Sequence, residues 1–369
     1  MKEERLKDSI KRILRSEERE IQEGFDDIEL LRLKNEALKL FRKEKEKEAP
    51  GLHKFIYAGL KIAASLVLII GISTLIYFMI GDQKSLLAEL AVDPVENQNN
   101  TETRLILSDG SQIEIDSDES FLEYDKLGKT VEIDSDNTLM LSSEDKKKEA
   151  PACHKLLVPY GKQSKIILSD GTIVWLNSGS YLLYPQVFSG KKREVFLKGE
   201  AYFDVARIES QPFIVQTSDI KVEVLGTVFN LMAYNEDSNV EAVVIEGSVK
   251  VSDSGTHLLG KKSTILSPGQ MASYSKNSKD INTSFVNTKH YVSWKEGYFL
   301  CKEISLEKLT QKLNRYYNTQ VTIETQVLKD MTFSGKLENR RSIEETLNII
   351  CVSTRLNYQR DGENGYIIQ

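Results

Sequence analysis

The sequence has few of the residues that hold metals or carry out covalent catalysis. It contains three cysteines and four histidines in 369 residues. No Cys-x-x-Cys pair, no cysteine–histidine cluster and no His-Glu-x-x-His pattern occurs, so nothing in the sequence indicates a zinc site. We therefore expect neither a bound metal nor a cofactor.

Glycine-rich phosphate-binding loops are also missing. Neither Gly-x-Gly-x-x-Gly nor Gly-x-x-x-x-Gly-Lys-Ser/Thr is present, and no histidine accompanies a serine or cysteine nucleophile motif. The sequence therefore indicates a protein that is not an enzyme. A glycan-modifying domain would need two carboxylates facing one another across a cleft, which a sequence alone does not show.

A basic surface of the kind that binds nucleic acid is absent as well. The formal net charge is −6, and the 49 Lys and Arg are interleaved with 55 Asp and Glu. We therefore expect no direct contact with nucleic acid. A content of 40% hydrophobic and 28% charged residues is typical of folded globular domains, and the length predicts two or three of them.

The three cysteines are Cys153, Cys301 and Cys351, which are widely spaced. Buried apolar thiols are the favoured interpretation. Cys301 and Cys351 are the only two that fall in one predicted domain, so a disulfide between them in an oxidising compartment is left open.

One long hydrophobic run stands out from this polar sequence. Residues 62–80 carry no charged side chain, and the apolar stretch around them begins at Phe55 with Lys61 as the only charge inside it. About 20 apolar residues in a helix span a bilayer core of about 30 Å, so we predict a single transmembrane helix over residues 55–80. The alternative is a buried core helix.

The charges that flank this run differ between its two sides. Six Lys or Arg precede it in residues 39–54, whereas residues 81–100 contain only Lys84. Positively charged residues stay on the cytoplasmic side of a membrane. We therefore predict a single-pass inner-membrane protein with a cytoplasmic N-terminus and a periplasmic C-terminal region.

Residues 1–54 predict a short cytoplasmic α-helical tail. Gly24 divides it into two charged, amphipathic segments. Their apolar stripe consists of Ile10, Ile13, Leu14, Ile21, Ile28 and Leu31. Helices this short need a partner, so the stripe indicates docking in a groove of a cytoplasmic protein. The alternative is a tail that only anchors the chain.

The region after residue 80 begins with a predicted linker and an all-β domain. In residues 81–155 we expect a periplasmic linker with one β-hairpin at 104–115, where apolar residues alternate around an Asp-Gly turn. Residues 156–290 contain short apolar runs between turn residues. This spacing predicts an all-β domain, either a sandwich or a solenoid.

The last 75 residues or so, 295–369, show a different pattern. Apolar residues at helical spacing predict helices over 306–317 and 342–354, and Ser342 and Glu345 form a capping box at the start of the second. Short apolar runs between them predict strands. We therefore expect a small α+β domain.

Several ordered motifs occur in these two domains: KIILSDGTIVWL at 165–176, FLKGEAYFDVA at 196–206, PFIV at 212–215, VLGTVFN at 224–230, IEGSV at 245–249, LSPGQ at 266–270 and WKEGYFL at 294–300. They strongly resemble the exported domain of FecR-type transmembrane anti-sigma factors. The last two are similar to the Bacteroidetes version, in which a small domain like the secretin/TonB short N-terminal fold follows. The resemblance covers about residues 156–369.

The resemblance implies a signalling relay for iron or glycan uptake. An outer-membrane TonB-dependent receptor would present its periplasmic signalling domain to residues 295–369. The β domain would pass the signal on, and the tail would release or activate an extracytoplasmic-function sigma factor to regulate transcription. The alternative is a membrane-anchored periplasmic scaffold without sigma-factor control.

The resemblance also implies one candidate for covalent chemistry. Some FecR-type regulators cleave themselves at a Gly-Thr bond by an N–O acyl shift, and Gly226-Thr227 stands in a matching LGTxF context. The threonine hydroxyl would attack the preceding carbonyl, and glycine would permit the strained backbone that this requires. The favoured alternative is a turn or bulge glycine followed by a β-favouring threonine.

Overall fold

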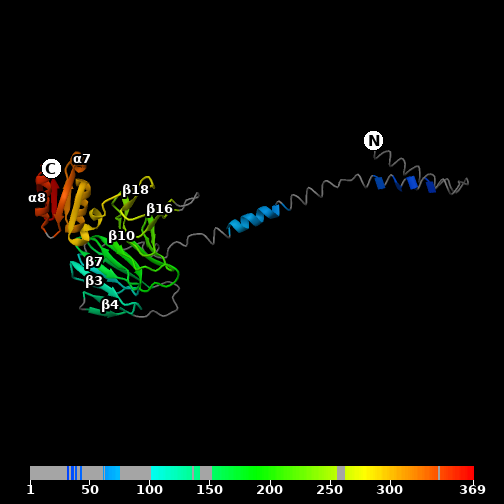
Figure 1. Cartoon of the computed structure of the whole chain (residues 1–369), viewed down its shortest axis with the longest axis horizontal. Coiled ribbons are helices and arrows are strands. Elements are labelled where there is room, and N and C mark those ends of the chain that lie inside the picture. The colour runs from blue at the N-terminus through cyan, green and yellow to red at the C-terminus, as the bar shows by residue number, and fades with distance from the viewer. Residues whose placement is uncertain are drawn as a thin grey trace. The chain divides into compact units, whose positions relative to one another are not determined.

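The chain, described here by a computed structural model, divides into two compact units, Met1–Asp82 and Gln83–Gln369. The structure describes residues 31–32, 35–36, 38–39, 42–43, 61, 63–74, 101–134, 137–141, 152–255, 262–339 and 341–369. Figure 1 draws these residues in colour.

The first unit contains helical residues between 31 and 43, at 61, and at 63–74. Among the described residues, no helix is long and apolar enough to cross a membrane. The predicted transmembrane helix over 55–80, and with it the single-pass fold class, is therefore wrong. The observed fold is mostly β-sheet.

The second unit begins with a β domain made of two sheets. The strands of the first sheet lie in the order β2 (Gln112–Ile115), β1 (Thr103–Ile106), β6 (Cys153–Val158), β9 (Ser180–Pro185), β10 (Arg193–Asp204), β11 (Phe213–Gln216), β12 (Ile220–Val224), β15 (Val249–Asp253) and β16 (Ser263–Leu266). All of these pairs are antiparallel except β10 with β11. β10 leads from this sheet into the second.

The strands of the second sheet lie in the order β5 (Asn137–Met140), β4 (Thr130–Ile133), β3 (Glu119–Tyr124), β7 (Gln163–Ile167), β8 (Ile173–Leu176), β10, β13 (Val228–Ala233), β14 (Asn239–Glu246), β17 (Gln270–Ser275) and β18 (Ile281–Phe285). Buried apolar side chains from both sheets form one core. The β domain is therefore a sandwich (Figure 1).

β10 changes sheets at Gly199. Residues before it pair with β9, and residues from Gly199 onward pair with β13. Gly199 has a φ of 102°, and a Cβ there would lie 2.5 Å from Oγ of Ser180. Only glycine fits this position without strain. Beyond it Ala201 and Phe203 are fully buried, while Tyr202 faces outward and is half-buried.

Residues 81–155 are not only a linker, which corrects the prediction for this segment. The expected hairpin forms as β1 and β2, but β1 also pairs with β6, and β3 runs parallel to β7. Leu105, Leu122 and Val131 are completely buried in the sandwich core. Their burial explains the pairing, because the alternating apolar residues of these short strands need a partner face.

The C-terminal domain follows a short connection through α5 (Lys289–Val292) and the 3-10 helix η1 (Ser293–Glu296). It contains β19 (Tyr298–Ser305), α6 (Leu306–Tyr317), β20 (Gln320–Ile323), α7 (Gln326–Asp330), β21 (Thr332–Glu338), α8 (Ile343–Thr354), β22 (Tyr358–Asp361) and β23 (Gly365–Ile368). β19 pairs with β21, and β20, β23 and β22 form a second small sheet.

Local sequence signals account for the helices of this domain. Ser305 accepts a hydrogen bond from the backbone N–H of Lys308 at the start of α6. At the start of α8 both hydrogen bonds of the Ser342–Glu345 capping box are present. The buried faces of the helices join a core that is separate from that of the sandwich, with Leu306, Leu309, Leu313, Leu347 and Ile350 among its fully buried members.

Candidate functional site

Gly226 and Thr227, the candidate cleavage pair, lie in the bend between β12 and β13. Thr227 is buried, and its Oγ1 donates a hydrogen bond to the carbonyl oxygen of Ser248 at 2.9 Å. A backbone carbonyl is not a base that takes up a proton. A Cβ on Gly226 would lie 2.5 Å from Cβ of Arg207, so close packing requires glycine there. Self-cleavage at this bond stays the alternative to the favoured turn or bulge glycine.

The apolar stripe of the tail lies almost wholly outside the described residues. Ile10, Ile13, Leu14, Ile21 and Ile28 are not among them. Leu31 is described as helical, with 63% of its surface exposed. Sigma-factor binding by the stripe stays a prediction.

Cys301 and Cys351 are free thiols in the core of the C-terminal domain, so the disulfide left open by the sequence does not form between them. Burial raises the pKa of Cys301 to about 11 and also raises the pKa of Cys351. Thiols with raised pKa values are poor nucleophiles at neutral pH. The interpretation as buried apolar cysteines fits both.

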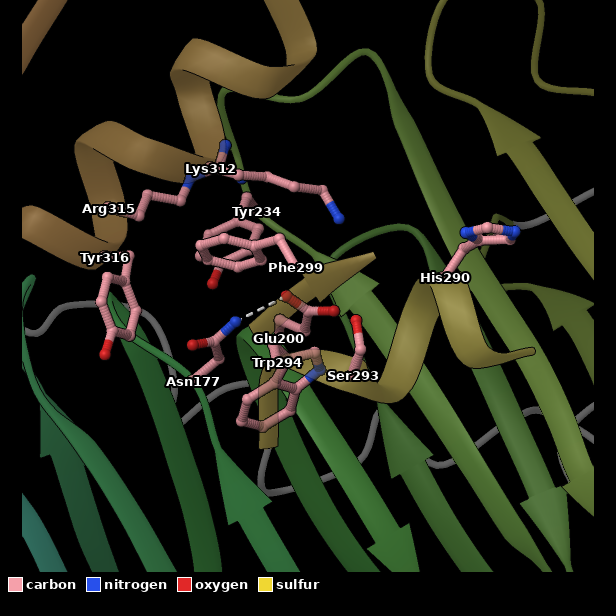
Figure 2. A pocket seen from close by; sticks show the side chains of 10 residues that line it. All are labelled: Asn177, Glu200, Tyr234, His290, Ser293, Trp294, Phe299, Lys312, Arg315 and Tyr316. Carbon is pink, nitrogen blue, oxygen red and sulfur yellow. Dashed lines mark hydrogen bonds between the residues drawn. The ribbon is translucent and has the colours of Figure 1, made fainter. Parts of the chain in front are cut away.

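The structure gathers a different set of residues at the junction between the β domain and the C-terminal domain. Trp294 of η1 is 4% exposed, and its Nε1 donates to Oδ1 of Asn230 at 3.3 Å. Asn230 and Asn177 donate to the two carboxylate oxygens of Glu200 at 2.9 and 2.8 Å. Figure 2 shows the hydrogen bond between Asn177 and Glu200 beside the indole of Trp294. The buried carboxylate of Glu200 therefore has both oxygens bonded, as burial of a charge requires.

Lys295 makes a second connection, directly after the tryptophan. Its ammonium lies 4.6 Å from the ring centre of Tyr202 and 5.3 Å from that of Trp175, both on the outer face of the second sheet. The two rings pack edge to face with centroids 5.3 Å apart. Cation–π contacts contribute about 0.5–2 kcal/mol each, depending on burial. Lys295 thus attaches η1 to the sandwich.

Arg315 of α6 makes the third connection. Its Nε and Nη2 lie 3.0 and 2.9 Å from Oε1 of Glu236, and its guanidinium also bonds both carboxylate oxygens of Asp237. The guanidinium carbon lies 3.7 Å from the ring centre of Tyr234. The N–H of Gly161 donates to the carbonyl oxygen of Arg315 at 2.9 Å. One arginine of the C-terminal domain therefore grips the loop between β13 and β14.

The space at the junction is unevenly filled. Around Trp294 and Glu200 the remaining cavity is about 10 Å³, room for roughly one water molecule (Figure 2). A second space, a cleft of about 580 Å³, is walled by residues 236–239 and Glu241 of the β domain and by β19 and α6. Arg315 lines both spaces. The junction is thus closed at Trp294 and hollow beside Arg315.

Charges of opposite sign face each other across the cleft. Glu241 on β14 is 9% exposed, and burial raises its pKa, while Lys308 and Lys312 of α6 act in the opposite direction. The two lysines are four residues apart, so they share one face of the helix. The arrangement can hold two domains together electrostatically.

None of these junction residues was selected from the sequence as a functional residue. One signal was present, because the chain has only two tryptophans, Trp175 and Trp294, and both lie at the junction. Glu200 stands inside the FLKGEAYFDVA motif at 196–206. Its neighbours Ala201 and Phe203 do fill the core, but Glu200 and Tyr202 face the C-terminal domain.

Known families match both domains. Residues 154–250 match the family described as FecR protein, and residues 298–368 match the family described as FecR, C-terminal. None of the curated proteins matches the chain.

Two crystal structures of a candidate anti-sigma factor from Parabacteroides distasonis ATCC 8503, at 1.65 and 2.50 Å resolution, are similar to the chain. Each is 29% identical, with a TM-score of 0.53, and the similarity covers 58% of this chain and 98% of that chain. The family matches and the structural likeness agree with the resemblance that the sequence motifs indicated. The chain is a FecR-type protein, with a FecR domain followed by a FecR C-terminal domain.

Proposed function

We propose that the chain is an anti-sigma factor that relays a signal from a TonB-dependent outer-membrane receptor to an extracytoplasmic-function sigma factor. The observations that carry the proposal are the ordered pair of FecR domains and the structural likeness to the candidate anti-sigma factor from Parabacteroides distasonis. Direct contacts at Trp294, Lys295 and Arg315 join the two domains. Binding of a partner to one domain can therefore change the position of the other.

In this proposal residues 1–54 capture the sigma factor through the apolar stripe. Replacing Ile10, Ile13 and Leu14 together with Asp should abolish co-purification of extracytoplasmic-function sigma factors with the full chain, because each Asp would carry an unpaired charge into an apolar groove. The control replaces Arg12 and Arg19, on the opposite face of the expected helix, with Asp. Capture by the triple variant at the wild-type level would refute the role of the stripe.

The C-terminal domain receives the receptor's signalling domain in this proposal. It contains small sheets whose edge strands and helices offer surfaces for another protein, as strand pairing or helix docking requires. A chain ending at residue 294 should still capture sigma factor but should lose its response to the receptor. A normal response from the shortened chain would show that the receiver lies elsewhere.

The proposed location is the inner membrane, with the N-terminus in the cytoplasm and the two FecR domains in the periplasm. Support comes from the excess of Lys and Arg in residues 39–54 over residues 81–100. Reporter enzymes fused after residue 100 should be active only in forms that work when exported. Activity of a reporter that works only in the cytoplasm would contradict this location.

A further inference from the structure

The contacts between the FecR domain and the C-terminal domain fall into two groups that differ in packing. The group at Trp294 is closed, with an indole buried to 4% exposure and a cavity of about 10 Å³ beside it. The group at Arg315 borders the cleft of about 580 Å³. The side chain of Glu236 is 48% exposed, so water reaches one partner of the arginine. The packing at Trp294 therefore suits a point about which the domains turn. The contacts at Arg315, which water reaches, suit a part of the junction that separates.

The second group is an electrostatic seam. Lys308, Lys312 and Arg315 lie on α6, and Glu236, Asp237 and Glu241 lie opposite them on the FecR domain. Contacts between two separately folded domains that are this polar favour relative motion of the domains. A buried ion pair of this kind contributes more to the choice of one arrangement than to overall stability.

We propose that Arg315 is a latch that holds the C-terminal domain closed on the FecR domain, and that the C-terminal domain opens by pivoting about the segment 286–297. Opening breaks the contacts of Arg315 with Glu236, Asp237 and Tyr234 and widens the cleft. The latch rests on the proposed relay and supplies its conformational step. A partner that bound the C-terminal domain would act by changing the balance between the closed and open arrangements.

The pivot segment has the features that such a motion needs. Gly297, directly after η1, has a φ of 81° and no atom within 4 Å of the position that a Cβ would take. The sandwich has its own apolar core, whereas the core of the C-terminal domain includes Trp294 of the segment and packs against Trp175 and Tyr202 of the FecR domain. Rotation at the segment therefore leaves the sandwich core closed and turns the C-terminal core away from Trp175 and Tyr202.

The two tryptophans give a direct readout in the full-length protein. Because the core of the C-terminal domain packs around Trp294 and against Trp175, opening uncovers both indoles, and intrinsic fluorescence reports on it without a label. Arg315→Gln should shift the emission maximum to the red and increase quenching by acrylamide. Raising NaCl to about 1 M, where the screening length falls to about 3 Å, should do the same to the wild type. Neither measurement needs a sigma factor or a receptor.

A charge swap separates a latch from a simple loss of folding. Asp237→Arg alone should behave like Arg315→Gln, because it places like charges together. The double variant Asp237→Arg with Arg315→Asp should bring emission and quenching back toward the wild type. Circular dichroism of each variant checks that the β-sheet content is retained.

A disulfide offers a reversible lock. A Cβ on Gly161 of the FecR domain would lie 3.3 Å from Cβ of Asn318, which follows α6. Disulfides join Cβ atoms about 3.5–4.5 Å apart, so a small adjustment closes the bond in Gly161→Cys with Asn318→Cys. The oxidised double variant, with the bond verified by peptide mass spectrometry, should lose the response of its fluorescence to salt. Reduction of the same protein should restore that response and serves as the control.

The outcomes separate cleanly. A red shift in Arg315→Gln, rescue by the charge swap and loss of the salt response in the oxidised lock support the latch. Wild-type emission and quenching in Arg315→Gln, or an unchanged salt response in the oxidised lock, would overturn it. Either result leaves the sigma-factor proposal standing, because that proposal is tested by co-purification with residues 1–54.

Discussion

The FecR domain and the junction each contain a buried arginine, and the two differ in what they hold together. Arg193 of β10 has no exposed surface and lies 2.8 Å from a carboxylate oxygen of Asp170. It also donates to the carbonyl oxygens of Ala206 and Gln211, each at 2.8 Å. Arg315 has a similar set of carboxylate and aromatic partners, but all of these belong to the other domain.

An arginine–carboxylate pair inside one domain has a structural role, whereas the same pair between two domains permits them to move. When Arg193 is lost, the carboxylate of Asp170, whose side chain is 5% exposed, stays packed against one sandwich without its counter-charge. When Arg315 is lost, the two domains can separate and its acidic partners become solvated. Loss of one partner of a buried charge pair is therefore costly when the other charge stays buried, and it changes the arrangement of two domains when the other charge can reach water.

The largest expected effect tests the fixed side of this comparison. Arg193→Met should lower the free energy of unfolding by about 3–5 kcal/mol, because Asp170 stays buried without its counter-charge. Urea denaturation of the full-length protein measures the loss. Arg207→Met is the control, since Arg207 pairs with Glu209 at 2.8 Å but both side chains are more than 70% exposed. It should change stability by less than about 0.5 kcal/mol. Equal losses in the two variants would remove the basis of the comparison.

The next effect concerns the crossing strand that fixes the sandwich. Gly199→Ala should cost about 2–4 kcal/mol, because the left-handed backbone and the contact with Ser180 both oppose a Cβ. Gly171→Ala is a matched control with a φ of 84° and no atom within 4 Å of the added carbon. It should cost only about 1–2 kcal/mol. Urea denaturation compares the two, and a larger loss at Gly171 would contradict the packing argument.

Much of the β-sheet and the helices of the C-terminal domain could be predicted because their signals are local. Alternation marks Ala201 and Phe203 as core residues, and they are buried. The helix expected over 306–317 forms over those residues, and the predicted capping box of α8 is present. These features depend on neighbours within a few residues.

Pairing between distant segments could not be predicted in the same way. The sequence of residues 119–124 does not indicate that β3 runs parallel to β7. The partner strand lies about 40 residues away, and the length of the connection does not set the register. The junction is harder still, since Arg315 and Asp237 lie 78 residues apart in sequence and in different domains. The transmembrane helix was inferred from composition alone, which sets an apolar length and not a conformation.

A smaller effect is expected at the candidate cleavage pair. Thr227→Val removes the hydrogen bond to Ser248 and should lower the free energy of unfolding by about 1 kcal/mol. Thr227→Ser, which keeps a hydroxyl, is the control. Mass spectrometry of the wild type should show an intact chain, because the hydroxyl donates to a backbone carbonyl. Fragments 1–226 and 227–369 that disappear in Thr227→Val would show that the hydroxyl is a nucleophile.

The smallest expected effect returns to the hollow side of the junction. Burial raises the pKa of Glu241, so the folded protein binds this proton more tightly than the unfolded chain does. The contribution of Glu241 to stability is therefore greatest at low pH and declines as pH rises from the unfolded pKa through the folded pKa. Glu241→Gln should remove this decline and raise the thermal unfolding midpoint slightly at pH 8, with little change at pH 4. Glu246→Gln, an exposed position on the same strand, is the control. A lower midpoint for Glu241→Gln at pH 8 would contradict this expectation. It would mean that attraction to Lys308 and Lys312 outweighs the cost of burying the carboxylate, and that these lysines stabilise the closed junction in addition to Arg315.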